Sequence, residues 1–336
     1  MFALGVTVMA GVYFAIRPDW KQTLRYIGFG CAIAALVQLA VVILTPQTAI
    51  HQDVNAGAWR GIFFEKNALG AAAAGAGLIF VTLVHVDKAI RWFWVTSLLL
   101  AVVLLIGARS TTSFIAFSIP SMIYIVLAAT KGRPSLRLAV IYAGATSVGM
   151  AVFVSMFFPD LLFDLVGKDA TFTGRTEIWA LATNSIAERP WTGFGYAAFW
   201  QEEYGPSFQV SSQLEWIVPN AHSTWLEQGL NSGIPGIIGL GVLTVWSFFR
   251  ALHLIVRREI AVPFVILIQL VIVSFSESTI LWTHNTLTCV LFVFASTLAC
   301  RLVIPEKAPQ VTEAARPSKH AVYTAQLAFK RPVRVR

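Results

Sequence analysis

The sequence predicts an all-α, polytopic integral membrane protein with about nine transmembrane helices and one large extracytoplasmic loop that contains short amphipathic helices. Composition is the first observation: 57% of the 336 residues are hydrophobic and 12% are charged, whereas a soluble domain is about half apolar and about a quarter charged. The mean hydropathy of +0.70 agrees. The second observation is that the apolar residues form long blocks without the alternation typical of membrane strands. The third is how charges divide between the connections.

The apolar blocks, with their flanks, are long enough for spanning helices, because a bilayer crossing takes about 20 residues. A helix satisfies its own backbone hydrogen bonds in lipid, so we expect helices rather than open strands. Two of the blocks, 1–16 and 92–107, are short. The nine blocks cover residues 1–16, 26–45, 67–84, 92–107, 112–130, 138–158, 234–250, 260–280 and 285–303.

The basic residues test this division, because cytoplasmic connections of membrane proteins are enriched in Lys and Arg. When alternate connections are assigned to the cytoplasm, 19 of the 25 basic residues and only five of the 17 acidic residues fall there. A wrong helix count would mix the two sets. Topology therefore explains the formal charge of +8. Nucleic acid is not implied as a partner, and residues 159–233 are placed on the extracytoplasmic side.

Four regions follow from this topology. Residues 1–158 form an N-terminal bundle of about six helices, 159–233 the large loop, and 234–303 three C-terminal helices. Residues 304–336 are expected to be a disordered, basic cytoplasmic tail near anionic lipid. Nine helices and an inside tail put Met1 outside, which suggests either that upstream helices are missing from this chain or that the first helix is only half of a helical hairpin.

No metal or cofactor is expected from the sequence. The three cysteines, Cys31, Cys289 and Cys300, all lie in apolar blocks and show no metal-binding spacing. Neither an HExxH pair nor a Gly-rich phosphate loop after a strand pattern is present.

The large loop carries two predicted helices. Residues 176–188 place apolar and small side chains on one face, which is typical of an amphipathic helix, and Pro190 ends it. A second helix is expected to begin at Asn220, a good N-cap residue, and to end near Gly229. His222 would then be the second residue of that helix, where the positive end of the helix dipole disfavours a protonated ring.

Two residues of this loop suggest chemistry. A neutral histidine at the outer membrane surface can act as a general base. The alternative is that His222 only forms a hydrogen bond with a neighbouring loop. Arg175, at or just before the first turn of the 176–188 helix, combines a guanidinium with unpaired backbone N–H groups, and this combination suits a phosphate.

Charged residues at the ends of apolar blocks are the supporting candidates. Arg109 lies at the outer end of its block and either binds substrate or snorkels to the interface. Lys66, beside Asn67, either takes part in the site or pairs with Glu65. Glu277 is a carboxylate inside an apolar block, so it is either functional or a structural partner of an arginine.

Several strings of residues resemble motifs of the O-antigen ligase and polysaccharide polymerase family of bacterial membrane glycosyltransferases. They are GIFFEKNALG (61–70), ARSTTSF (108–114), GRTEIW (174–179) with RPWTGFGYAAF (189–199), and NAHSTWLEQGLNSGIPGIIGL (220–240). A weaker match is SFSESTILW with the following HN, near 274–285. The order is that of the family, and the resemblance runs from about residue 55 to 303. Members of the family usually have more helices before the large loop than the six counted here.

The resemblance implies a metal-independent, inverting transfer of a glycan from an undecaprenyl-diphosphate carrier to a sugar hydroxyl. The reaction would take place at the periplasmic face of the bacterial inner membrane. His222 is similar to the family's base that deprotonates the acceptor, and Arg175 and Arg109 are similar to the residues that hold the diphosphate. The supporting residues on this view are Lys66, Asn67, Glu277 and Asn220.

The expected partners are the lipid-linked oligosaccharide donor, a glycan or lipid A–core acceptor, and membrane lipids, with polysaccharide export and chain-length proteins as further candidates. Ligase and polymerase stay open, although GIFFEKNALG is closer to the exopolysaccharide polymerases. One alternative is a transporter or flippase of lipid-linked glycans, for which charges and broken helices at mid-membrane are typical. Another is a non-catalytic scaffold of a polysaccharide-assembly complex.

Overall fold

The computed structural model describes residues 2–52, 55–142, 175–200, 206–214, 217–280 and 286–303. Within these ranges the regular structure is helical, and the one β-type pairing is an isolated bridge between Ile50 and Trp59. The predicted all-α class is confirmed. The block at 138–158 beyond residue 142, the first part of the large loop and the tail at 304–336 lie outside the described residues.

Helices occupy eight of the nine predicted blocks, and residues 134–142 are helical at the start of the remaining one. Among the described residues, five helices are long and apolar enough to cross a membrane, and three shorter apolar helices accompany them. A polytopic membrane protein is therefore confirmed, while the count of nine spans stays a prediction. The helices are α1 (Phe2–Ile16), α2 (Trp20–Leu44), α3 (Pro46–Ala49), α4 (Lys66–Val86), α5 (Arg91–Ala108), α6 (Thr111–Ala129), α9 (Arg175–Glu188), α10 (Ser207–Leu214), α11 (Thr224–Arg258), α12 (Val262–Ser274) and α13 (Thr286–Val303).

Two of these helices differ from their predicted blocks for local reasons. α2 begins before the block at 26–45 because the Asp19 carboxylate caps it, accepting hydrogen bonds from the backbone N–H groups of Lys21 (2.9 Å) and Gln22 (3.3 Å). α12 ends at Ser274, and residues 275–280 are not helical. The block at 260–280 is therefore wrong as a continuous helix, and its last part is the connection on which the candidate site is built.

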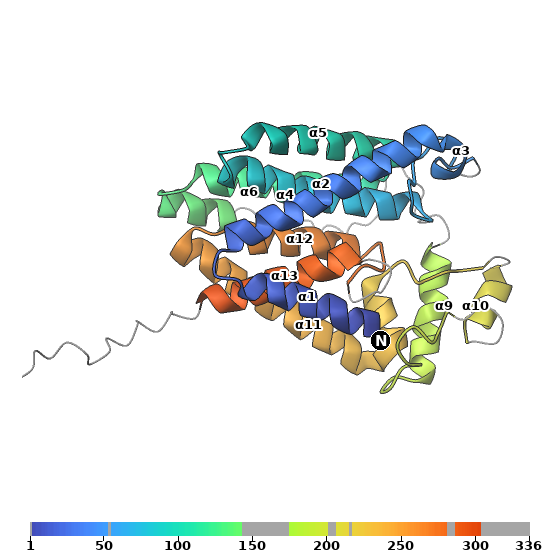
Figure 1. The fold of residues 1–336 in the computed structure, drawn as a ribbon. Helices are drawn as coiled ribbons and strands as arrows, with labels where there is room; N and C mark the ends of the chain where they lie inside the picture. Colours follow the sequence, from blue (N-terminus) through green and yellow to red (C-terminus); the bar gives the residue numbers. More distant parts are fainter. Residues whose placement is uncertain are drawn as a thin grey trace, which may run out of the picture. The chain divides into compact units, whose positions relative to one another are not determined.

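The spanning helices pack in two groups (Figure 1). One group contains α2, α4, α5 and α6, and the other contains α1, α11, α12 and α13, with α12 packed against α6 between them. The shorter helices α9 and α10 lie at one end, where α9 packs against α11. The residues of the large loop are thereby held against the C-terminal helices.

α4 is the most buried candidate span, with 72% of its apolar window inside the protein. Its run of Ala and Gly allows α6 to approach closely. A Cβ atom at Gly70 would lie 2.5 Å from the Ser113 hydroxyl, and one at Gly77 would lie 2.8 Å from the Phe117 ring. Small residues have this use in membranes because helix association there depends on close van der Waals contact.

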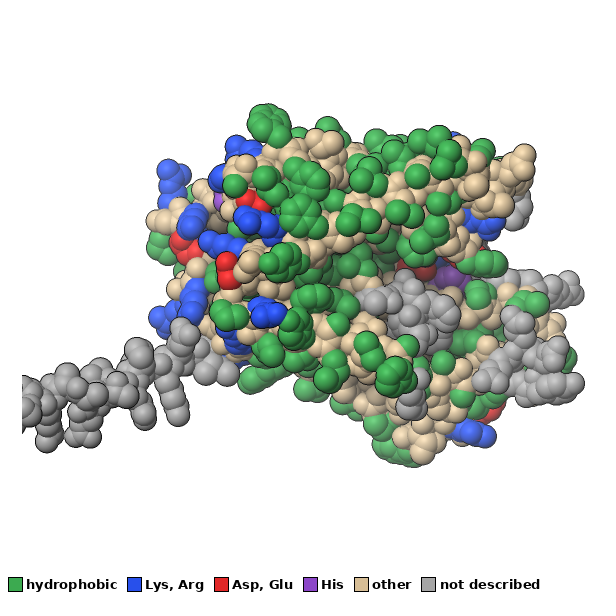
Figure 2. Space-filling model, viewed as in Figure 1, with side chains coloured by type: hydrophobic (Ala, Val, Ile, Leu, Met, Phe, Trp, Pro, Cys, Tyr) green, Lys and Arg blue, Asp and Glu red, His purple; other side chains and the backbone are tan. Residues whose placement is uncertain are grey.

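Lys and Arg side chains gather at one end of the helices, on the left in Figure 2, and hydrophobic side chains cover much of the visible face beyond them. Arg25 of α2 forms an ion pair with Asp87, directly after α4 (2.8 Å), and Arg137 forms one with Glu259, directly after α11 (3.0 Å). The charge count assigned all four residues to the cytoplasmic side. The structure thus brings these connections together at one end.

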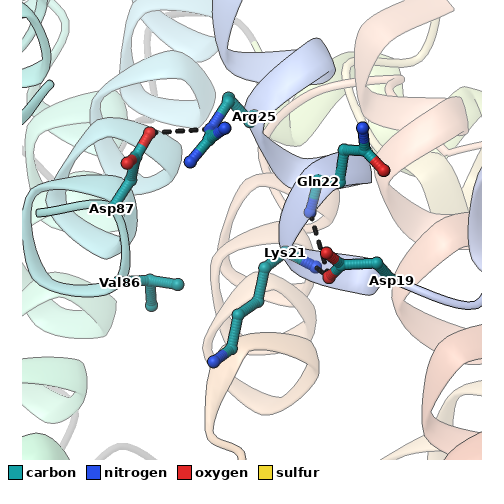
Figure 3. A pocket seen from close by; sticks show the side chains of 6 residues that line it. All are labelled: Asp19, Lys21, Gln22, Arg25, Val86 and Asp87. Atoms are coloured by element: carbon teal, nitrogen blue, oxygen red, sulfur yellow. Dashed lines mark hydrogen bonds and ion pairs between the residues drawn. The ribbon is translucent and has the colours of Figure 1, made fainter. Parts of the chain in front are cut away.

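Burial raises the pKa of the Asp87 carboxyl, but the hydrogen bonds from Trp94 and Arg25, with the charge of Arg25, hold it below its ordinary value. A cavity of about 290 Å³ lies beside this pair (Figure 3). Its lining includes both acidic and basic side chains: Asp19, Lys21, Gln22, Arg25, Val86 and Asp87. It is at the end of the helices away from α9 and α10, so it is not part of the candidate site.

α11 is one helix of 35 residues with a break at Gly233, where φ is 69° and ψ is −164°. The sequence predicted two elements here, a helix from Asn220 to about Gly229 and a span from 234. The predicted start is wrong, because Ser223 is the N-cap and Asn220 lies in the loop before it. The predicted stop near Gly229 lies close to the break at Gly233, and the span predicted from 234 begins directly after that break.

Candidate functional site

The connection at 275–280, directly after α12, forms the floor of the site. Its backbone is not helical, so its polar groups need other partners. The Thr224 hydroxyl at the start of α11 supplies them: it donates to the carbonyl of Glu277 (2.9 Å) and accepts from the N–H groups of Thr279 (3.0 Å) and Ile280 (3.3 Å). The start of α11 and this connection are therefore held together.

Arg175 is the first residue of α9 and reaches the same connection. Its Nη1 donates to the carbonyl of Ser276 (2.5 Å), and its Nη2 forms an ion pair with Glu277 Oε1 (2.8 Å). The predicted amphipathic helix is confirmed as α9: the buried residues Ile178, Ala182 and Ile186 lie on the expected face. That buried face fixes the end of α9 from which Arg175 extends.

His222 lies on the other side of Glu277. Its Nδ1 is 3.5 Å from Glu277 Oε2, close enough for an ion pair with a protonated ring but without hydrogen-bond geometry. Because Ser223 is the N-cap of α11, the expectation that His222 would be the second residue of a helix is wrong. Its backbone instead adopts φ 48°, in the left-handed region, and its N–H donates to Asn220 Oδ1 (2.8 Å).

Asn220 therefore supports His222, though not as a helix cap. Its side-chain oxygen accepts from His222 N–H and also from the Ser278 hydroxyl (3.1 Å). This geometry is an Asx turn, in which the side chain bonds to the backbone two residues on. The same oxygen ties the His222 loop to the connection that carries Glu277.

A further carboxylate, Glu227, was not singled out from the sequence. It lies in the first turn of α11 and is 2% exposed. Its oxygens accept from the N–H of Ala221 (2.6 Å), the indole of Trp200 (3.0 and 3.2 Å) and the Ser278 hydroxyl (3.4 Å). An acidic residue in a first helical turn is ordinarily exposed and interacts with the helix dipole, so position alone gave no signal. The polar run Glu227, Gln228 and Asn231 before an apolar span was the available signal.

The RPWTGFGYAAF motif docks on the break in α11. The Ile234 N–H donates to the Pro190 carbonyl (2.7 Å), and the Phe194 N–H donates to the Leu230 carbonyl (2.7 Å). The Asn231 side chain accepts from the Ala197 N–H (3.0 Å). The turn predicted from the glycines of this motif thus satisfies backbone groups that the bend at Gly233 leaves unpaired, and it carries Trp200 to Glu227.

Arg109 lies in a different place. It is the C-cap of α5, has a left-handed backbone (φ 50°), and donates through Nη1 to the Ala56 carbonyl (3.3 Å). Its side chain is exposed. Across the described ranges, no hydrogen bond or ion pair joins it to Arg175, Glu277 or His222.

Lys66 and Asn67 open α4 and are half-buried. In the parts of the chain that the structure covers, neither forms a hydrogen bond or ion pair with the Arg175–Glu277–His222 cluster. Their supporting role and the alternative pairing of Lys66 with Glu65 stay predictions.

The cluster combines a cation, a carboxylate and an imidazole around one point. Arg175, Glu277 and His222 keep between 13% and 16% of their side-chain surfaces exposed, so a substrate can reach them. A carboxylate beside an imidazole orients the ring and stabilises its protonated form. A guanidinium offers paired donors to phosphate oxygens. Among the described residues, no group of three or more His, Cys, Asp or Glu side chains could hold a metal ion.

The fold and this cluster define a class: a helical, multi-pass membrane protein with a histidine–carboxylate–arginine site at the end opposite its basic connections. α12 links these ends, since Glu259 lies just before it and Glu277 just after it. Residues 96–241 match the family model described as O-Antigen ligase. That segment contains Arg109, Arg175 and His222 and ends before Glu277.

A curated relative extends the similarity. Over 270 residues the chain is 26% identical to the exopolysaccharide production protein ExoQ of Rhizobium meliloti (strain 1021), covering 76% of this chain and 61% of that protein. The chain therefore spans about three fifths of the length of the relative that it matches. The two matches confirm the predicted resemblance of the chain to the O-antigen ligase and polysaccharide polymerase family.

Proposed function

We propose that the protein is a glycosyltransferase that moves a glycan from an undecaprenyl-diphosphate carrier to a sugar hydroxyl at the periplasmic face of the inner membrane. The observation that carries the proposal is the convergence of Arg175 and His222 on the two oxygens of Glu277, at 2.8 and 3.5 Å. Three chain segments far apart in sequence meet there and bring an imidazole close to a guanidinium. That pair of groups is what transfer from a diphosphate requires.

The reaction follows from these groups. The acceptor hydroxyl gives its proton to the ring nitrogen of His222 while its oxygen forms a bond to the anomeric carbon of the donor. The bond between that carbon and the diphosphate oxygen breaks, and its electron pair leaves with the diphosphate. Attack from the face opposite the leaving group inverts the configuration. Arg175 stabilises the charge that develops on the diphosphate.

Glu277 links the two halves of this step. With one oxygen it holds Arg175, and with the other it faces the His222 ring that becomes positive as the proton arrives. A negative charge at that distance stabilises the positive charge that develops on the ring during the transfer. In this proposal Arg109, at the end of α5, is a second cation for the diphosphate, which the donor would reach across the surface between the two helix groups.

Within this class, polymerisation of an exopolysaccharide is the favoured activity. The similarity to an exopolysaccharide production protein supports it, and so does the form of the 61–70 motif. A transporter of the same lipids is less well supported, because transport sites are typically near mid-membrane and this cluster lies beyond the end of α12.

The test is complementation of a polysaccharide-deficient strain by the full chain and by its His222→Ala and Arg175→Ala variants, at matched membrane abundance. We expect both to lose polysaccharide production. Matched controls are His253→Ala and Arg257→Ala, two exposed residues near the C-terminal end of α11, and these should complement fully. Full complementation by His222→Ala and Arg175→Ala would favour a scaffold and contradict the proposal.

The intermediates that accumulate separate the remaining activities. A polymerase defect leaves lipid-linked single repeats on the periplasmic leaflet. A ligase defect leaves lipid-linked polymer, and a transport defect leaves repeats on the cytoplasmic leaflet. Only the first two results agree with a glycosyltransferase, and the first is the expected one.

A further inference from the structure

We propose that Glu227 is a positioning residue that holds His222 in its reactive conformation. This inference rests on the proposed role of His222 as the base. In the described part of the chain, no hydrogen bond joins Glu227 to His222. It acts on the residue before it, through the 2.6 Å hydrogen bond from the Ala221 N–H.

The Glu227 carboxylate accepts hydrogen bonds from three separate chain segments. Ala221 belongs to the loop before α11, Trp200 to the end of the RPWTGFGYAAF motif, and Ser278 to the connection that carries Glu277. The Ala221 N–H, the Trp200 indole and the Ser278 hydroxyl all donate to the Glu227 side-chain oxygens. The Glu227 side chain is 2% exposed, so its oxygens are occupied by these protein donors and not by bulk water. The carboxylate therefore fixes the loop relative to the floor of the site.

The His222 backbone needs such support. A left-handed conformation is uncommon for a residue other than glycine and persists only where the surroundings enforce it. The loop is held at three successive points: Glu227 binds the Ala221 N–H, the Trp179 indole donates to the Ala221 carbonyl (2.9 Å), and Asn220 binds the His222 N–H. Release of the first point frees the peptide that sets the direction of the His222 side chain.

The burial of Glu227 argues for a positioning role and against direct participation of this side chain in catalysis. A carboxylate that is 2% exposed and already occupied by three donors offers no surface to a sugar or a diphosphate. Its effect must therefore pass through His222. A shift of about 1 Å in a catalytic group can cost on the order of 10²-fold in rate, while the binding of the donor by Arg175 is left in place.

Two substitutions distinguish the contribution of the Glu227 side-chain length from that of its negative charge. Glu227→Gln keeps the length and an acceptor oxygen for Ala221 but removes the charge, whereas Glu227→Asp keeps the charge and withdraws the oxygen by one methylene. The assay is polymer formation by the full chain in nanodiscs, with lipid-linked repeat unit extracted from the native host as donor and rates normalised to folded protein. Glu188→Gln and Glu188→Asp, at the exposed end of α9, are the matched controls.

We expect kcat of Glu227→Asp to fall by roughly 10- to 100-fold, with KM for the donor within about threefold of wild type. Glu227→Gln should stay within about tenfold of wild type, and the controls should be unchanged. An Asp variant as active as Gln or more active would overturn the proposal, as would a loss expressed mainly in KM. Retained activity of His222→Ala would instead contradict the proposed function, so the two failures are distinguishable.

Discussion

At the scale of single residues, Glu277 connects the other two residues of the site. One carboxylate oxygen holds the guanidinium of Arg175, and the other faces the ring of His222. Without its charge, Arg175 would keep only the Ser276 carbonyl as a partner in the described structure, and the protonated ring of His222 would lose its nearest anion. The two groups to which we assign different tasks in the proposed glycan transfer are therefore coupled through Glu277.

Glu277→Gln should lower polymer synthesis by on the order of tenfold or more, because a neutral amide replaces a charge-assisted hydrogen bond and no longer stabilises the imidazolium. The fold should survive, since Gln occupies the same volume. The measurement is the initial rate with the lipid-linked donor, normalised to folded protein. Glu188→Gln, exposed at the end of α9, is the control. A wild-type rate for Glu277→Gln would show that its charge has no catalytic importance.

The sequence indicated some of these residues and missed another, for physical reasons. Arg175 and His222 stand in recognisable motifs, and Glu277 was evident as a carboxylate inside an apolar block. Glu227 looked like an ordinary acidic residue in a first helical turn. Its importance arises from burial against Trp200 and the 275–280 connection. Those are contacts over long sequence separations, which local pattern does not encode.

At the scale of elements, the bend in α11 determines how the large loop meets the membrane helices. The arm before Gly233 carries Thr224 and Glu227 into the site, and the arm after it is the predicted span. Gly233 has a conformation that is essentially restricted to glycine, and the Pro190 carbonyl fills the space where a side chain would be. The sequence predicted both arms, as a helix ending near Gly229 and a span beginning at 234, but it did not predict that they join at Gly233. The loop that stabilises the break contains Pro190 and Phe194, so it belongs to a segment that comes well before α11 in the chain.

Gly233→Ala should destabilise the protein by at least about 2 kcal/mol, since an added Cβ would lie 2.4 Å from the Pro190 carbonyl oxygen in an unfavourable backbone conformation. The thermal midpoint should then fall by roughly 5 °C. Gly239→Ala in the same helix is a sharp control, because nothing lies within 4 Å of its added Cβ. Alanine there should be neutral or slightly stabilising. Equal midpoints for the two variants would contradict the role assigned to the bend.

At the scale of the whole molecule, charge patterning predicted which connections lie at the same end of the helices, but it did not predict how the helices pack. The alternate connections assigned to the cytoplasm do meet at one end, as the Arg25–Asp87 and Arg137–Glu259 pairs demonstrate. The contacts of α12 with α6 and of α1 with α13 were not predictable. Lipid is as apolar as the helix surfaces, so which helices pack together depends on small residues and on surface shape. A hydropathy pattern does not contain this information.

The two ends allow an orientation to be proposed. The positive-inside rule predicts a cytoplasmic location for the basic end, and Glu277, at the other end of α12, would then lie on the opposite side of the membrane. Alkaline phosphatase, which is active only after export, should be active when inserted after Gln213 in α10 and inactive when inserted after Gly132, in the turn between α6 and the helical residues 134–142. Both insertions are made in the full chain and compared at equal abundance. The reverse pattern would put the Arg175–Glu277–His222 cluster in the cytoplasm. A glycosyltransferase working on exported lipid-linked repeats could not then use it.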